Sequence, residues 1–185
     1  MAEWKMEPGT WEDAEAAVGR HLATTVGADE VTLAAIRAKL EVCGFDCPIH
    51  YDEEVAQQLG YRTVVAPASM LLTWATEPYW SPGDPAPKPG DPCMTAPFAA
   101  TSVPAPCHAI TAIRCETEYL EPVYPGDRIT SNVKLASVVR KRTRIGDGAF
   151  MVLETTYTKQ SGEVVGLEHM TVFRYEPDGQ SGDES

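Results

Sequence analysis

The stretch CGFDCPIHYDEE, residues 43–54, holds one histidine, four acids and two cysteines within twelve residues. These residue types are compatible with four kinds of site. They could form a metal site, a redox pair of thiols, an acid–base pair, or only the polar start of a helix. The spacing of the residues separates these possibilities.

The cysteines do not have the spacing of a metal or redox site. Cys43 and Cys47 are four residues apart, which is neither the CxxC of a dithiol centre nor a zinc knuckle, and no second Cys/His pair has finger spacing. The remaining cysteines are Cys93, Cys107 and Cys115, and the N-terminal stretch has no secretory signal, so we expect reduced thiols. The sequence therefore predicts no metal site and ordinary packing roles for the thiols.

The overall composition excludes several classes of protein. The formal net charge of -12 at pH 7 argues against a nucleic-acid-binding protein, which needs a basic face. No segment has the roughly 18 uninterrupted apolar residues of a membrane span. We therefore expect a cytoplasmic protein of one domain that binds neither nucleic acid nor membrane.

Three helices are predicted in the first half of the chain, around the histidine-containing stretch. Apolar residues recur at helical spacing over residues 28–44, and acids lead a second short helix over residues 52–60. Residues 67–80 begin at a proline and are apolar nearly all round, which predicts a buried, central helix. A short strand within residues 19–32 precedes the helices, and residues 1–19 are expected to form a flexible acidic leader.

The second half begins with a proline-rich segment and continues as strands. Residues 81–107 cannot form a regular helix or inner strand, which predicts either a linker or a loop that covers a groove. Beyond it, alternation of apolar and polar residues predicts four long antiparallel strands in a meander: 108–120, 129–140, 149–160 and 164–177. An antiparallel sheet wrapped around one central helix is the α+β hot-dog fold. That single domain would span residues 20–176, followed by a disordered tail, 177–185.

The residues around the histidine resemble a known family. The sequence CGFDCPIHYD at 43–52 is similar to the motif (Ser/Thr)-Gly-Asp-x-Asn-Pro-(Ile/Val/Leu)-His-x-(Asp/Glu) of the MaoC-like, (R)-specific enoyl-CoA hydratase family. The following EEVAQQLGYRTVVAPASM and the later EYLEPVYPGDRI also match that family. The segment APASM looks more like the N-terminal, FAS1-like dehydratase-domain branch, which includes steroid side-chain hydratase and mycolic-acid dehydratase subunits. The resemblance covers residues 20–176 and implies a hot-dog fold.

The resemblance also implies a reaction and a site. In that family an Asp and a His five residues apart activate one water, which adds to the double bond of an enoyl thioester of coenzyme A or acyl carrier protein, with no cofactor. His50 stands at the histidine position, but Phe45 replaces the aspartate and Cys47 the asparagine. Asp46 is one residue out of register: it could reach the site from a loop, whereas in a helix it would be turned about 100° away.

Several roles for the stretch therefore stay open. The favoured one is a subunit of an enoyl-CoA hydratase whose Asp/His motif is completed by a second hot-dog subunit in a hetero-oligomer. The alternatives are an autonomous homodimer that uses His50 and Asp46, and a non-catalytic module that binds acyl thioesters. A Cys47 nucleophile beside His50 lacks a third, base-orienting group. His50 could also be a satisfied histidine at the start of the next helix, and Asp52 is expected to be the N-cap of that helix.

Two further groups of residues could complete an acyl-thioester site. The resemblance implies that the free N–H groups of Ala68 and Ser69 bind the thioester oxygen, although simple helix capping explains them equally well. Trp74, Tyr79 and Trp80 could line an acyl pocket, or could pack in the core.

The one basic cluster of this acidic chain lies near residue 140. Arg140, Lys141 and Arg142 could bind the phosphates of coenzyme A, here or in the site of a partner subunit. The alternative is a solvated hairpin tip between two predicted strands.

Overall fold

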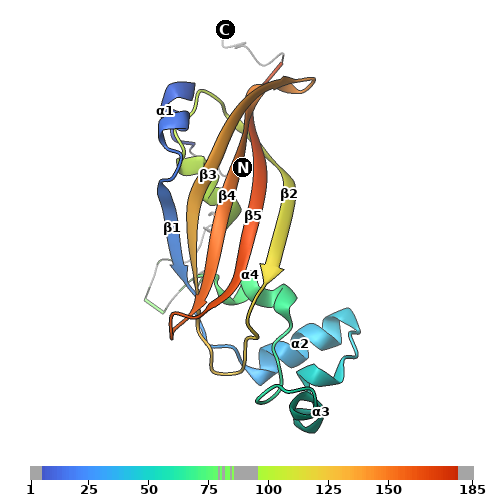
Figure 1. Cartoon of the computed structure of the whole chain (residues 1–185). Coiled ribbons are helices and arrows are strands. Elements are labelled where there is room, and N and C mark those ends of the chain that lie inside the picture. Colours follow the sequence, from blue (N-terminus) through green and yellow to red (C-terminus); the bar gives the residue numbers. More distant parts are fainter. Residues whose placement is uncertain (1–5, 79, 81, 84, 86–95, 179–185) are drawn as a thin grey trace.

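The computed structural model describes residues 6–78, 80, 82–83, 85 and 96–178. Within these residues the chain forms one five-stranded antiparallel sheet with the order β1-β3-β4-β5-β2 (Figure 1). The strands are β1 (His21–Val26), β2 (Ala109–Tyr119), β3 (Ile129–Thr143), β4 (Gly146–Lys159) and β5 (Val164–Pro177). The α+β prediction is confirmed, and all five strands lie in the segments where the sequence predicted strands.

The helices are short, and two of them extend from one end of the sheet. They are α1 (Trp11–Ala16), α2 (Leu33–Cys43), α3 (Glu53–Gln58) and α4 (Leu71–Trp74), with 3-10 helices η1 (Pro48–His50), η2 (Ala68–Met70) and η3 (Ala96–Ser102). Helix α2 ends at Gly44, whose φ of 56° is left-handed and suits glycine. Helix α3 begins at Asp52, whose carboxylate accepts the N–H of Val55 at 3.2 Å, as predicted. Figure 1 shows α2 and α3 together beyond the lower end of the strands.

The predicted meander is wrong for its first strand. Strand β2 pairs with β5 at the far edge of the sheet, whereas β3, β4 and β5 do form a meander. The connection over residues 120–128 therefore crosses three inter-strand spacings, about 14 Å, which a chain of this length spans easily. Alternation identifies strands but carries no information about which strands become neighbours.

The predicted central helix over residues 67–80 is too long. The regular part comprises only η2 and α4 and ends at Trp74. Pro78 prevents a longer helix, because it has no N–H to donate to the Trp74 carbonyl and its ring clashes with that carbonyl in a helix. Helix α4 packs closely on β5: a Cβ on Gly166 would lie 2.6 Å from the Leu71 side chain.

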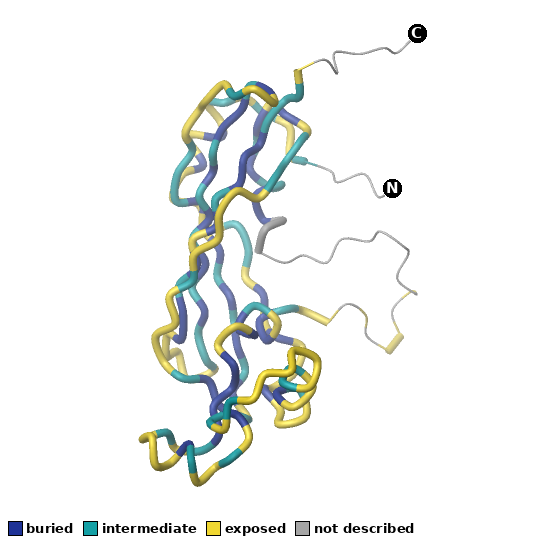
Figure 2. The backbone as a smooth tube through the Cα atoms, turned by 90° about the vertical axis from the view of Figure 1, so that its right-hand side faces the viewer, coloured by how far each residue is buried: buried dark blue, intermediate teal, exposed yellow. Residues whose placement is uncertain are grey.

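The core divides into two clusters along the inner face of the sheet, and buried positions run along both halves of it (Figure 2). One cluster packs α2 and α4 against the end of the sheet near residues 129, 157 and 165. The other packs the end of the proline-rich segment against the middle strands, with Ala100 and Val103 fully buried. The described end of this segment thus covers the sheet as part of the core, and none of its residues lines a groove of the kind that the sequence suggested.

A buried arginine holds this cover in place. Arg174 on β5 has no exposed surface. Its guanidinium donates hydrogen bonds to the carbonyl oxygens of Ala100 at 3.0 Å, Cys107 at 3.1 Å, and Val103. Burial lowers the pKa of Arg174. The sequence did not predict this contact.

The expected flexible leader contains an ordered helix. Thr10 and Asp13 form a capping box at the start of α1. Ala14 and Ala17 are buried against the sheet as part of the core. The packed domain therefore begins before residue 20, because these small apolar residues bury surface that composition alone did not reveal.

Some sequence predictions concern features other than this core. The predicted tail lies outside the described residues from position 179, as does Tyr79. The described cysteines, namely Cys43, Cys47, Cys107 and Cys115, are free thiols. Across the described ranges no cluster of three or more His, Cys, Asp or Glu side chains could hold a metal ion, and no helix is long and apolar enough to cross a membrane.

Candidate active site

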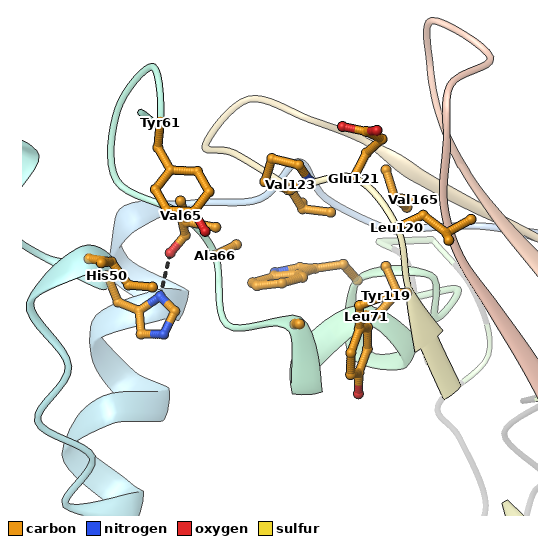
Figure 3. Close-up of a pocket in the computed structure, with 14 residues that line it drawn as sticks. His50, Tyr61, Val65, Ala66, Leu71, Tyr119, Leu120, Glu121, Val123 and Val165 are labelled. Carbon is orange, nitrogen blue, oxygen red and sulfur yellow. Dashed lines mark hydrogen bonds between the residues drawn. The ribbon is translucent and has the colours of Figure 1, made fainter. Parts of the chain in front are cut away.

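A pocket of about 250 Å³ lies beside η1, η2, α4 and the end of β2. It is lined by Ile49, His50, Tyr61, Val65, Ala66, Ala68, Leu71, Trp74, Tyr119, Leu120, Glu121, Pro122, Val123 and Val165. Most of these side chains are apolar, and the polar exceptions are a histidine, two tyrosines and a glutamate. Figure 3 shows His50 and Tyr61 on one side of the pocket and Glu121 and Leu120 on the other. An apolar cavity with a few polar groups is typical of a small-molecule site.

His50 is the titratable group that is held most firmly in this pocket. Only 8% of the residue is exposed, and its Nδ1 lies 2.6 Å from the carbonyl oxygen of Val65. A carbonyl oxygen only accepts hydrogen bonds, so Nδ1 donates here, and in the neutral form of the ring the lone pair lies on Nε2. The N–H of Val65 in turn donates to the carbonyl oxygen of Ile49 at 2.9 Å, so η1 is held against the segment around Val65 by two hydrogen bonds. His50 is thus positioned to accept a proton or a hydrogen bond at Nε2.

The residue at the family's aspartate position lies beside this histidine but cannot share its chemistry. The ring centroids of Phe45 and His50 are 5.7 Å apart, with the rings tilted by 45°. Asp46 is exposed, does not line the pocket, and accepts a hydrogen bond from the Tyr51 hydroxyl at 2.5 Å. This bond raises the pKa of Tyr51. The structure therefore brings Phe45, and not Asp46, to the imidazole.

The N–H groups of Ala68 and Ser69 lie at the start of η2, where a helix has no internal acceptors for its first donors. Ala68 lines the pocket, whereas Ser69 does not. Both residues are exposed. One of the two predicted oxyanion donors is therefore next to the cavity.

The three aromatic residues predicted to line an acyl pocket, Trp74, Tyr79 and Trp80, differ in where the structure places them. Trp74 is 6% exposed, lines the pocket, and belongs to the core cluster around α4. Trp74 also lines a second cavity of about 500 Å³, together with Asp29 and Glu30. Trp80 is 47% exposed and is not part of the pocket lining. Tyr79 is outside the described residues.

The basic cluster lies at the opposite end of the sheet. Arg140, Lys141 and Arg142 stand at the β3–β4 hairpin, far from α2 and α3 (Figure 1). Arg140 stacks over the Trp11 ring at 5.5 Å, and Arg142 pairs with Asp178 at 2.9 Å. The structure thus does not bring these residues to the pocket of the same chain.

Tyr61 is a pocket residue that sequence reasoning missed. It directly follows Gly60, the glycine that ends the α3 segment, and begins the stretch that leads to Val65. No periodicity marks it, but the segment LGYRTVVAP that contains it is part of the resemblance. The resemblance of this segment to the family could therefore have identified Tyr61 as a pocket residue.

The fold and this site define a class: a hot-dog sheet with a histidine-containing pocket next to its short central helix. The chain matches the family model "FAS1-like, dehydratase domain region" over residues 16–168, and it belongs to that family. The FAS1-like dehydratase-domain branch that the resemblance implied is therefore confirmed.

Two curated relatives align with most of the chain. It is 33% identical over 152 residues, 82% of its length, to a probable enoyl-CoA hydratase alpha subunit of Thermomonospora curvata. It is 26% identical over 152 residues to the 3-oxo-4,17-pregnadiene-20-carboxyl-CoA hydratase alpha subunit of Mycobacterium tuberculosis. Each alignment covers 47% of the relative, so the chain spans about half the length of the curated relatives it matches.

Solved structures share the fold. A chain of the ChsH1-ChsH2 complex from M. tuberculosis superposes with a TM-score of 0.68 at 21% identity, covering 91% of this chain and 95% of that one. The MaoC-like dehydratase from Rhodospirillum rubrum gives 0.54 at 19% identity, covering 83% and 91%. These similarities confirm the hot-dog fold.

Proposed function

We propose that this chain is one subunit of an enoyl-CoA hydratase and that a second hot-dog subunit supplies the intact Asp/His pair. The observation that carries the proposal is Phe45 beside His50. Hydration needs one group to take a proton from water and one to deliver a proton to carbon. His50 can serve as the first group, whereas the phenyl ring of Phe45 cannot serve as the second.

The substrate would be a coenzyme A thioester with an apolar acyl group. The family assignment and the hydratase alpha subunits among its relatives support this class of substrate. The apolar pocket next to the start of η2 supports an acyl chain with its thioester near Ala68. Trp74 would form one wall of the acyl site.

Strand β2 offers an edge for the partner subunit. It pairs with β5 on one side only, and it carries exposed apolar side chains at Ile113 and Tyr119. Leu120, directly after it, is also exposed and lines the pocket. A long edge strand of this kind is a template for pairing with another chain. A partner on this edge would stand next to the pocket. The similar folds of the ChsH1-ChsH2 and HadBC complexes of M. tuberculosis support such a pairing.

The test is reconstitution. The chain is purified alone and together with a hot-dog protein encoded beside its gene, and hydration of an enoyl-CoA is followed by loss of the enoyl thioester absorbance. We expect activity only in the mixture, and this activity should survive His50→Ala in this chain. Activity of the chain alone that His50→Ala abolishes would instead establish an autonomous hydratase. No activity in either sample, with an enoyl-CoA still bound, would make the chain a binding module.

A further inference from the structure

Glu168 is a buried carboxylate that plays no part in the proposed hydration. It lies on β5, two positions before the core residue Met170, so its side chain faces the same side of the sheet as the core. Only 5% of the residue is exposed. Its cross-strand neighbours are Thr117 on β2 and Thr155 on β4. The carboxylate therefore stands in a row of hydroxyl groups on the inner face of the sheet.

This carboxylate is poorly compensated within the described part of the chain. Its Oε2 accepts hydrogen bonds from the hydroxyls of Tyr157 and Thr117, each at 3.4 Å, which is long for such bonds. Its Oε1 has no hydrogen-bond partner, and the Oγ1 of Thr155 has none either. No described Lys, Arg or His forms an ion pair with Glu168. A buried negative charge without a cation costs free energy, so a cation is the group that gains most by binding here.

The row of hydroxyl groups opens at the edge strand β2. Cys115, Thr117 and Tyr119 alternate along the inner face of β2, and Cys115 and Tyr119 are exposed. Among the described strands β2 pairs only with β5, and Figure 1 shows it at the edge of the sheet. Glu168 is one strand in from this edge, and neighbouring strands are about 4.8 Å apart. An extended Lys or Arg side chain of a protein bound along β2 is long enough to cross that spacing.

We infer that Glu168 binds a Lys or Arg side chain of the partner subunit, and that the two side chains form an ion pair buried at the interface along β2. An ammonium or guanidinium group has donors for both atoms that lack a partner, the Oε1 of Glu168 and the Oγ1 of Thr155. The inference rests on the proposed function, because that proposal places a second hot-dog subunit on this edge. It adds the chemistry by which the partner is recognised.

A second copy of this chain does not supply the cation through the same edge. The inner face of its β2 would bring a thiol, a hydroxyl and a phenol to Glu168, none of which is basic. Arg114 is the one basic residue of β2, but it faces the outer side of the sheet and pairs with Glu116 at 2.5 Å. The unpaired charge of Glu168 therefore favours a hetero-oligomer over a homodimer.

The experiment compares Glu168→Gln with the wild type in two measurements on the purified full chain. In urea denaturation of the chain alone the variant should have a higher midpoint, because the amide removes an unpaired charge from the interior. In calorimetric titration with the hot-dog protein encoded beside the gene, the variant should bind at least about 30-fold more weakly. This factor is the smaller end of the loss expected when one member of a buried charge pair is removed.

Glu118→Gln is the matched control. It removes the same charge from β2, but Glu118 is exposed and directly follows Thr117, so its side chain faces the outer side of the sheet. This variant should leave the urea midpoint unchanged and the affinity for the partner within about twofold of the wild type.

Four results would overturn the inference: an affinity of Glu168→Gln equal to that of the wild type, an equal loss in Glu118→Gln, a urea midpoint of Glu168→Gln at or below that of the wild type, or no complex with the partner. A complex of the chain with itself that Glu168→Gln weakens would also overturn it. Hydration activity of the mixture judges the proposed function separately. An active mixture with unchanged affinity of Glu168→Gln would refute only the inference. An inactive complex that Glu168→Gln weakens, with the control unaffected and the midpoint raised, would refute only the proposed function.

Discussion

Replacing Arg174 with methionine should release the proline-rich cover from the sheet. The guanidinium is completely buried and binds three carbonyl oxygens, those of Ala100, Val103 and Cys107. Methionine fills a similar volume, but it leaves the three carbonyls facing an apolar side chain without donors.

The magnitude follows from these contacts. A hydrogen bond to a charged group contributes about 1.5–3 kcal/mol, so three of them contribute several kcal/mol. The cost of burying the guanidinium offsets part of this sum. We therefore expect the free energy of unfolding to fall by about 3–5 kcal/mol, a large share of the 5–15 kcal/mol typical of a domain.

Urea denaturation measures the loss of unfolding free energy, and hydrogen exchange shows which part of the chain is destabilised. The amides of residues 99–107 should lose protection more than those of β3 and β4. Arg140→Met is the matched control, because Arg140 is exposed and, among the described residues, its side chain has the Trp11 ring as its one observed contact. A loss of about 1 kcal/mol or less in Arg174→Met, or a loss equal to that of the control, would refute the structural role given to Arg174.

Three other predictions follow from the site and the core. Phe45→Asp should raise the hydration activity of the chain alone at least about 10²-fold above that of the wild type, because it places an acid beside His50. The double variant Phe45→Asp, His50→Ala should be inactive in the same absorbance assay. Gly27→Ala should destabilise the fold by about 1–3 kcal/mol in urea denaturation, because its Cβ would lie 1.9 Å from the Trp74 carbonyl oxygen; an unchanged midpoint would contradict this packing. Burial raises the pKa of Tyr157 above its usual 10.0, so as pH rises above 10 the unfolded chain loses the phenol proton before the folded chain does, and the free energy of unfolding should fall. Tyr157→Phe should make the urea midpoint depend less steeply on pH in this range.

Local sequence patterns predicted the elements well. Asp52 is the N-cap of α3 and Gly44 ends α2, because capping depends on residues three or four positions apart. Alternation found β2 to β5 for the same reason. The exceptions are the helix expected over 67–80, which ends at Trp74, and α1, which forms where a flexible leader was expected.

The candidate site was predictable only in part. The motif identified His50 and showed that Phe45 replaces the acid, but the direction of Asp46 depends on its bond to Tyr51. Tyr61 enters the pocket through a turn that no periodic pattern marks. The basic residues near Arg140 looked suitable for phosphates, yet strand length carries them to the far end of the sheet.

The sequence by itself determined where the five strands and helices α2 and α3 form, and that the acid of the motif is missing, because each of these depends on residues within a few positions. The tertiary structure decided that β2 lies beside β5, that Arg174 is buried under the proline-rich cover, and that the Nδ1 of His50 meets the carbonyl oxygen of Val65. These outcomes depend on contacts between residues far apart in the chain. The free energies of these contacts add up over the whole fold, so a pattern of neighbouring residues cannot predict them.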